Sequence, residues 1–260
     1  MTSLRVGAVR LTRVGYADVP LPPETVGLTA SDVAAIDWAE PTWAEGGQVR
    51  AAAAAWIIES GDARIVVDPA LAADAILRNE QDAAAHQEAF AAALAGAGFA
   101  RETITHAVAT HYDGIGMLAW RTDDGRWAPF FPNAGLLISE RELAAWDRPE
   151  LRDLEEAGAI RPTGERHVIT SEVSLEHTGA HSVGHQIVRV ESEGERAVIV
   201  GHLAVVPLHL ATGVCEQEHD EPEAAWQVLS AIRDEGALLI GPLWPTPGCG
   251  RWDGSQLVPA

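Results

Sequence analysis

The hydrophobic and polar positions of the chain predict short strands joined by turns, with a few helices between them. Two mainly apolar runs, at residues 49–58 and 63–67, have the lengths of strands. The pair Gly61-Asp62 between them suits a hairpin turn. Residues 1–45 contain prolines at positions 20, 22, 23 and 41, so we expect this segment to be rich in loops.

The first clear helical pattern lies at residues 81–95. Phe90 and Leu94 are four positions apart among alanines, and Gly96 ends the pattern. A short apolar strand is predicted next, at residues 104–109. It leads directly into a segment that contains a histidine.

Two further helices are predicted from capping patterns. Ser139 with Glu142, and Asp220 with Glu223, have the spacing of a capping box. The second of these helices has one apolar face and ends at Gly236. Further strands are predicted at residues 136–138, 167–170, 173–176, 187–191, 197–200 and 237–240. This order favours an α/β fold in which two mostly antiparallel or mixed sheets pack face to face with helices on both outer faces, formed by residues 1–260 as a single domain.

Composition excludes several classes of function. The net charge of −20 argues against nucleic acid or an anionic membrane surface as a partner. All 18 basic residues are arginine, which excludes Schiff-base catalysis and a phosphate-loop nucleotide site. Cys215 and Cys249 are too few for a disulfide framework. No apolar run is long enough to span a membrane and no secretory signal is recognisable, so we expect a cytoplasmic protein with a small-molecule substrate.

The most informative motifs contain histidine. Thr110-His111-Tyr112-Asp113-Gly114 follows the strand at residues 104–109, Thr178-Gly179-Ala180-His181 lies about seventy residues later, and Gly201-His202 follows a third strand. Imidazoles and a carboxylate on separate loops are the residue types that bind zinc or iron.

These motifs, with their order along the chain, resemble the metallo-β-lactamase superfamily, in particular its lactonase- and esterase-like hydrolases. The rest of the resemblance lies in Val67-Asp68-Pro69, Phe131-Pro132-Asn133-Ala134, Pro207 and Pro245. It covers nearly the whole chain. It implies an αββα sandwich with a metal site at one edge of the sheets, and it implies that Asp68 orients the histidine loops.

The same resemblance indicates a degenerate metal-binding motif. Counted back from Asp113 without a gap, the two histidine positions are Ala109 and His111, and a deletion beside His111 leaves the same number of ligands. Other expected ligand positions carry Gly114, His202, Val205, Val206 and Leu243. We therefore do not expect a dinuclear centre. A single zinc or iron ion held by His111, Asp113, His181 and His202 remains possible, and so does a site without metal.

Three functions remain open. With one metal, the protein is a hydrolase of a small ester, lactone or thioester. Without metal, Tyr112, Asp113, His181 and His202 can form an acid/base cluster for a lyase, isomerase or dehydratase of specialised metabolism. The third possibility is a non-catalytic binding protein. Four more residues are expected at the substrate pocket, although packing explains most of them equally well: His185, His209, Trp244 and Cys249. The sequence does not indicate an oligomeric state.

Overall fold

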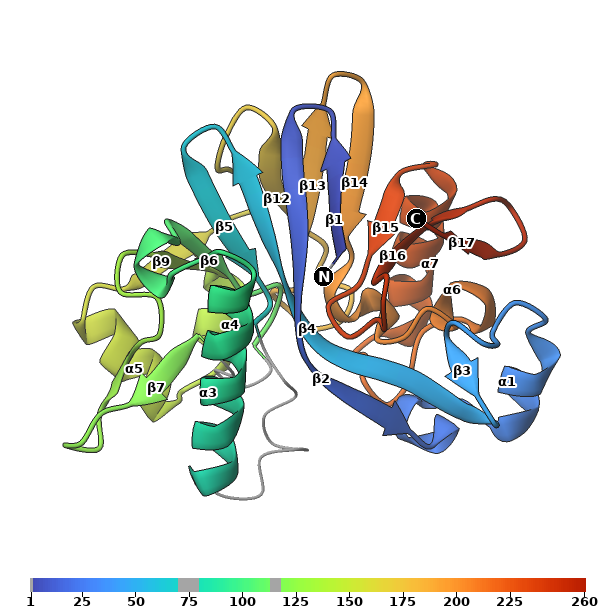
Figure 1. The fold of residues 1–260 in the computed structure, drawn as a ribbon, viewed down its shortest axis with the longest axis horizontal. Coiled ribbons are helices and arrows are strands. Elements are labelled where there is room, and N and C mark those ends of the chain that lie inside the picture. The colour runs from blue at the N-terminus through green and yellow to red at the C-terminus, as the bar shows by residue number, and fades with distance from the viewer. Residues whose placement is uncertain (1, 70–79, 113–117) are drawn as a thin grey trace.

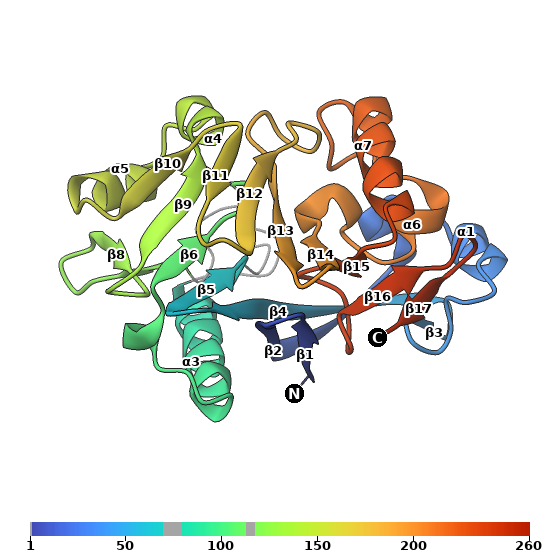
Figure 2. The ribbon, with the colours of Figure 1, turned by 90° about the horizontal axis from the view of Figure 1, so that it is seen from above.

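The computed structural model describes residues 2–69, 80–112 and 118–260, and it has two large sheets packed face to face (Figures 1 and 2). In these residues, eight strands form the first sheet, in the order β1-β2-β4-β5-β6-β9-β10 with β3 beside β4. They are β1 (Thr2–Val6), β2 (Val9–Leu21), β3 (Ala44–Glu45), β4 (Gln48–Ser60), β5 (Ala63–Val67), β6 (His106–Val108), β9 (Gly135–Ser139) and β10 (Ile160–Thr163).

The second sheet has its strands in sequence order. They are β11 (Arg166–Val168), β12 (Val173–His177), β13 (Gln186–Ser192), β14 (Glu195–Ile199), β15 (Leu238–Ile240), β16 (Cys249–Trp252) and β17 (Leu257–Pro259). A separate hairpin consists of β7 (Ala119–Arg121) and β8 (Trp127–Pro129).

Helices flank both sheets (Figure 1). On the side of the first sheet lie α3 (Glu80–Gly96), α4 (Glu140–Ala145) and α5 (Pro149–Glu156), with the short η2 (Arg101–Thr103). On the side of the second lie α1 (Ala30–Ala35), α6 (His209–Thr212) and α7 (Pro222–Asp234), with the short helical turns η1 (Pro23–Val26) and η3 (Gly201–Ala204). The predicted αββα sandwich is confirmed. Among the described residues, no helix combines the length and apolar character needed to cross a membrane.

Alternation along the strands divides the core into three layers. In β4, Trp56 and Ile58 point between the sheets, whereas Ile57 points outward beneath the helices of the first sheet. In β14, Ile199 likewise faces the other sheet while Val198 packs toward the helices of the second. Because successive side chains of a strand point to opposite faces, strands that are apolar at every position specify sheets buried on both faces.

Two predictions for the ends of the chain are wrong. Residues 1–45 are not mainly loop: β1 and the 13-residue β2 form a hairpin, and β2 pairs along almost the whole length of β4. No strand is predicted after residue 240, but the C-terminal segment contributes β16 and β17. Prolines suggested loops in residues 1–45, but Pro20 lies near the end of β2, where a residue without an N–H group is tolerated.

The two predicted capping boxes are also wrong. Ser139 does cap α4, by accepting a hydrogen bond from the N–H of Arg141, but Glu142 does not reach back to it. At α7 the N-cap is Glu221, with no side-chain cap, and the N–H of Asp220 donates to the carbonyl of His181 instead. In both cases a tertiary contact replaces the local one.

Candidate metal centre

Three loops converge at one end of the sandwich because of the directions of their strands. β5 and β6 are parallel, so Asp68 and His111 both lie beyond the same edge of the first sheet. In the second sheet, β12 and β14 both flank β13 antiparallel and so end on the same side. The N–H of Gln186, at the start of β13, donates to the carbonyl of Thr110 at 2.8 Å, which joins the two edges.

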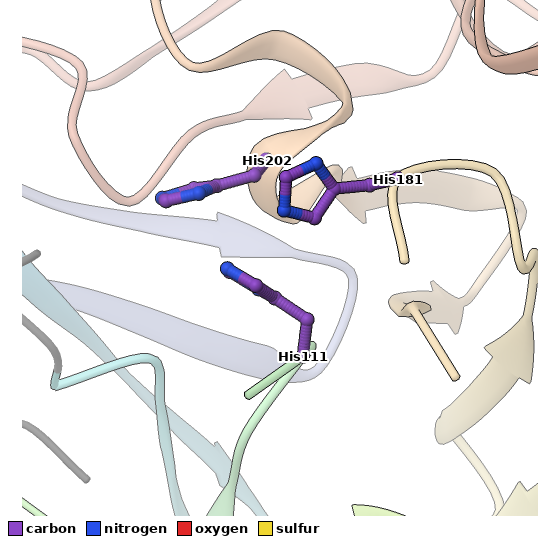
Figure 3. A group of neighbouring side chains, drawn as sticks. All are labelled: His111, His181 and His202. Atoms are coloured by element: carbon purple, nitrogen blue, oxygen red, sulfur yellow. The ribbon is translucent and has the colours of Figure 1, made fainter. Parts of the chain in front are cut away.

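His111, His181 and His202 come together at this end (Figure 3). One ring nitrogen from each lies within 4.8 Å of the others, and all three residues are buried. The ring centroid of His111 is 4.6 Å from that of His181 and 4.3 Å from that of His202. Three of the four expected metal ligands therefore form one cluster. The fourth, Asp113, lies outside the described residues, as does Gly114.

A chain of hydrogen bonds fixes the orientation and tautomer of His111. The carboxylate of Asp68 accepts hydrogen bonds from the Thr110 N–H at 2.8 Å and from the Thr110 hydroxyl at 2.6 Å. The hydroxyl has given its only proton to Asp68, so its 3.0 Å contact with His111 Nδ1 requires that Nδ1 carry a proton. Nε2 then holds a free lone pair. Asp68 was expected to orient the histidine loops, and these hydrogen bonds bear this out for the loop that carries His111.

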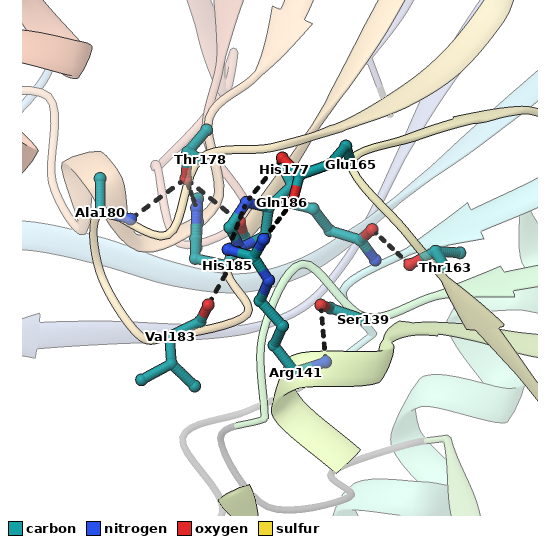
Figure 4. Close-up of polar contacts among 10 residues, drawn as sticks. All are labelled: Ser139, Arg141, Thr163, Glu165, His177, Thr178, Ala180, Val183, His185 and Gln186. Carbon is teal, nitrogen blue, oxygen red and sulfur yellow. Dashed lines mark hydrogen bonds and ion pairs between the residues drawn. The ribbon is translucent and has the colours of Figure 1, made fainter. Parts of the chain in front are cut away.

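The loop that carries His181 is a tight turn closed by hydrogen bonds (Figure 4). The N–H groups of Thr178 and Gly179 both donate to the carbonyl of His185, and the Thr178 hydroxyl lies 2.7 Å from His185 Nδ1. At its other side, His177 Nε2 donates to the carbonyl of Val183 at 2.9 Å. These hydrogen bonds define the shape of the turn.

His202 reaches the cluster because η3 begins immediately after β14. The preceding residue, Gly201, has φ of 56°, a conformation that glycine adopts without strain. A Cβ atom at this position would lie 2.6 Å from His185 Nε2 and 2.7 Å from the Thr110 hydroxyl. Glycine at position 201 therefore allows the three loops to approach one another.

Burial keeps these imidazoles neutral. It is the largest cause that lowers the pKa of His111 and His185 well below the usual value, and neighbouring histidines lower both further. Burial also lowers the pKa of His181, and that of His202 to about 4. Neutral imidazole is the form that binds a metal ion.

Several buried ring nitrogens in this region have no hydrogen-bond partner within the described part of the chain. They include His111 Nε2, His181 Nδ1 and His185 Nε2. A buried polar atom without a partner is unfavourable, so such atoms are uncommon in folded proteins. The three clustered imidazoles, neutral and with lone pairs to share, could hold an ion of a metal that prefers nitrogen ligands.

Tyr112, expected to act in catalysis, is directed away from the cluster. Its hydroxyl donates to the Glu150 carboxylate at 2.5 Å, and its ring packs at a tilt of 39° against that of Trp146, with centroids 5.3 Å apart. It belongs to the core beneath the helices of the first sheet. Because its side chain enters that outer layer, the structure does not bring it to His181 and His202.

The four residues expected at the substrate pocket are all fully buried. His185 lies under the cluster, with its ring 5.6 Å from that of His181. His209 Nε2 donates to the carbonyl of Val26 at 2.9 Å. Trp244 Nε1 donates to the carbonyl of Ala204 at 2.9 Å, and Cys249 packs between the sheets. In the structure, therefore, His185 is the one of these four that contacts the clustered histidines.

Sequence reasoning missed His219. Its ring lies 4.9 Å from that of His181, and its Nδ1 lies 3.2 Å from the carbonyl of Ala180. A carbonyl can only accept, so Nδ1 carries the proton, and the buried Nε2 has no partner in the described residues. No motif marks this histidine in the sequence, where it lies among four acidic residues, Glu216, Glu218, Asp220 and Glu221.

The structure is similar to solved structures of metallo-β-lactamase-fold hydrolases. The hydrolase AbOPH of the β-lactamase superfamily is 16% identical, with a TM-score of 0.75 over 99% of this chain and 96% of its own. AidC, a dizinc quorum-quenching lactonase in complex with a product, is 15% identical, with a TM-score of 0.76 over 100% and 97%. A probable metal-dependent hydrolase from Staphylococcus aureus is 15% identical, with a TM-score of 0.71 over 92% and 91%.

These likenesses show the fold. No family model and no curated protein matches the sequence.

Proposed function

We propose that the protein is a hydrolase of a small ester, lactone or thioester that uses one metal ion, zinc or iron, held by His111, His181 and His202. The observation that carries the proposal is the convergence of three buried imidazoles from three separate loops. Two of them have a buried ring nitrogen with no partner among the described residues. An ion bound there would act as a Lewis acid toward a carbonyl group.

The residues around the cluster have supporting roles in this proposal. Asp68 and Thr110 hold His111 in the tautomer whose Nε2 is free to bind. His185 packs against His181, with ring centroids 5.6 Å apart, and its Nε2 leaves no room for a residue larger than glycine at position 201. The neighbour AidC was solved with N-hexanoyl-L-homoserine as its product, so an N-acyl homoserine lactone is a reasonable first substrate to test.

Two observations weigh against the alternative, a metal-independent lyase or isomerase. The Tyr112 hydroxyl is bonded to Glu150 rather than to the histidines. The pKa of His202 is lowered to about 4, and that of His181 is lowered as well, so neither exchanges protons readily at neutral pH. An acid/base cluster built from these residues is therefore poorly matched to its task.

The test is elemental analysis of protein purified without chelator, beside turnover of N-hexanoyl homoserine lactone, simple lactones, aryl esters and a thioester. We expect about one equivalent of zinc or iron and hydrolysis of at least one compound, with metal and activity both lost on chelation. His181→Ala should lose both. His209→Gln, which alters a buried histidine outside the group of three, should keep both.

Other results would overturn the proposal in distinguishable ways. Turnover that survives chelation and the absence of bound metal would support the metal-independent enzyme. Absence of both metal and turnover would support a binding protein. The metal content of His202→Asp should be measured as well. A rise from one to two bound metal equivalents would show that the histidine at position 202 restricts the site to a single ion.

A further inference from the structure

One buried carboxylate contacts both of the loops that carry His111 and His181. Glu142 lies in α4 and its side chain is fully buried. A buried carboxylate is costly unless several hydrogen bonds satisfy it, and Glu142 accepts four. Its spacing from Ser139 suggested a cap for its own helix, but none of the four donors is the Ser139 backbone.

The two oxygens of Glu142 are divided between the two loops. Oε1 accepts from the Ser182 hydroxyl and, at 2.9 Å, from the Gly184 N–H, so it holds the residues that follow His181. Oε2 accepts from the Tyr112 N–H at 3.1 Å, the residue after His111, and from Trp146 Nε1 at 3.0 Å. One rigid group therefore sets the spacing between the backbones of the two loops.

Gly184 shows how closely this contact is fitted. A Cβ atom at position 184 would lie 2.5 Å from both the Cγ and the backbone nitrogen of Glu142, and 2.9 Å from the Ser139 hydroxyl. No side chain fits there unless α4 moves. The His181 loop thus lies directly against the first turn of α4.

We propose that Glu142 is the positioning residue that fixes His111 and His181 at the separation a single ion requires. Gln186 already ties the residues before His111 to the second sheet, through its bond from Nε2 to the carbonyl of Ala109 at 2.8 Å. Glu142 supplies the corresponding tie on the other side of His111. Without Glu142 the two loops lose this tie, and we expect the separation of their rings to vary. The inference rests on the proposed metal site.

The test is Glu142→Gln, which keeps the shape but replaces one oxygen with an amide NH₂ that faces N–H donors. With the NH₂ group at the Oε1 position the Gly184 N–H loses its acceptor, and with it at the Oε2 position the Tyr112 N–H loses its acceptor. We expect zinc affinity to fall at least about tenfold, the size typical of a lost supporting group. We also expect the visible absorption spectrum of the cobalt-substituted protein to change, because it reports ligand geometry.

Glu172→Gln is the matched control. Glu172 also accepts hydrogen bonds from hydroxyl groups, from Ser60 at 2.8 Å and from Thr170 at 3.3 Å, but at the opposite end of the sandwich. This variant removes a carboxylate that joins the two sheets, and we expect unchanged zinc affinity and an unchanged cobalt spectrum. If Glu142→Gln fails to fold, Ser182→Ala removes one donor to Oε1 and should weaken zinc binding about fivefold.

A readout without metal separates this inference from the proposed function. In metal-free protein, a nuclear Overhauser effect should connect the ring protons of His111 and His181, whose centroids are 4.6 Å apart, and it should weaken in Glu142→Gln. Zinc affinity within twofold of wild type, with the same cobalt spectrum and the same Overhauser effect, overturns the role of Glu142. A wild-type protein that takes up no metal contradicts the proposed function, and the Overhauser effect then decides the role of Glu142.

Discussion

Polar side chains lie at both ends of the sandwich, but their hydrogen bonds differ. At one end they join the two sheets, and at the other they orient histidine rings. At the end away from the histidines, the Ser60 hydroxyl lies 2.7 Å from that of Thr170 and donates to Glu172 at 2.8 Å. The Thr170 hydroxyl also accepts from two backbone N–H groups. The side chains of Ser60, Thr170 and Glu172 are thus bonded to one another, and the arrangement holds the first sheet against the second.

At the histidine end, the hydrogen bonds are used to orient groups whose remaining atoms have no partner. Asp68 and Glu142 are well bonded, but the nitrogens they help to place are not, in the part of the chain that the structure describes. Complete pairing is typical of a structural contact, whereas an oriented lone pair is typical of a ligand site. The contrast supports the proposed site at the histidine end.

The largest effect that would sharpen this contrast concerns the metal-free protein. We expect its free energy of unfolding to decrease as the pH falls. Burial lowers the pKa of His209 to about 4, against 6.5 for an unperturbed histidine, and the clustered histidines shift in the same direction. The unfolded chain therefore binds more protons between these values. This contribution to stability is fully present above pH 6.5 and is lost as the pH falls toward 4.

Each unit of pKa difference corresponds to about 1.4 kcal/mol, so His209 alone changes the free energy of unfolding by a few kcal/mol. Urea unfolding of metal-free protein at pH 7.5, 6 and 5 should show this loss. His209→Gln should have a flatter profile, because it removes one of the groups that must be protonated. A free energy of unfolding that increases as the pH falls from 7.5 to 5 would contradict the inference that these histidines are buried and neutral.

Removal of one clustered imidazole should have the next largest effect. His111→Ala deletes one of three nitrogens, and we expect zinc affinity to fall more than about 100-fold. His209→Ala is the control: it deletes another fully buried imidazole and its bond to the carbonyl of Val26, and should leave zinc affinity unchanged. Both variants lose buried contacts, so a lowered melting temperature in both is expected and does not decide the question. Equal zinc affinity in the two variants would contradict the assignment.

The sequence predicted the fold better than the details of the site, for a physical reason. Residues 49–58 and 63–67 form β4 and β5, because short apolar runs on either side of a turn favour buried strands. His111, His181 and His202 were found because their motifs follow strands, and strand ends determine where loops meet. By contrast, Glu142 satisfied a local capping pattern, while three of its four partners lie 30 to 42 residues away along the chain. His219 has no motif at all, and only tertiary packing brings it beside His181.

Asp68→Asn should have a smaller effect than loss of a ligand. Asp68 has φ of 42°, and asparagine tolerates this left-handed conformation well, so the backbone should be kept. The asparagine amide has one oxygen instead of two, so it cannot accept hydrogen bonds from both the N–H and the hydroxyl of Thr110 as the carboxylate does. The Nδ1–H tautomer of His111 therefore becomes less favoured. We expect zinc affinity to fall about 10-fold to 100-fold, measured by competition with a chromophoric chelator. An unchanged affinity would show that the hydrogen-bond chain does not tune the ligand.

The smallest effect belongs to the opposite end of the sandwich. Ser60→Ala removes the hydroxyl that joins β4 to Thr170 and Glu172, and a hydrogen bond of this kind contributes about 1 kcal/mol to stability. We expect the melting temperature to fall by about 2 to 4 °C and zinc affinity to stay the same, because the serine is separated from the histidines by the length of β5. Ser60→Thr, which keeps a hydroxyl, should restore part of the loss. A change in zinc affinity in Ser60→Ala would mean that the two ends are coupled, and that the division between a structural end and a ligand-binding end does not hold.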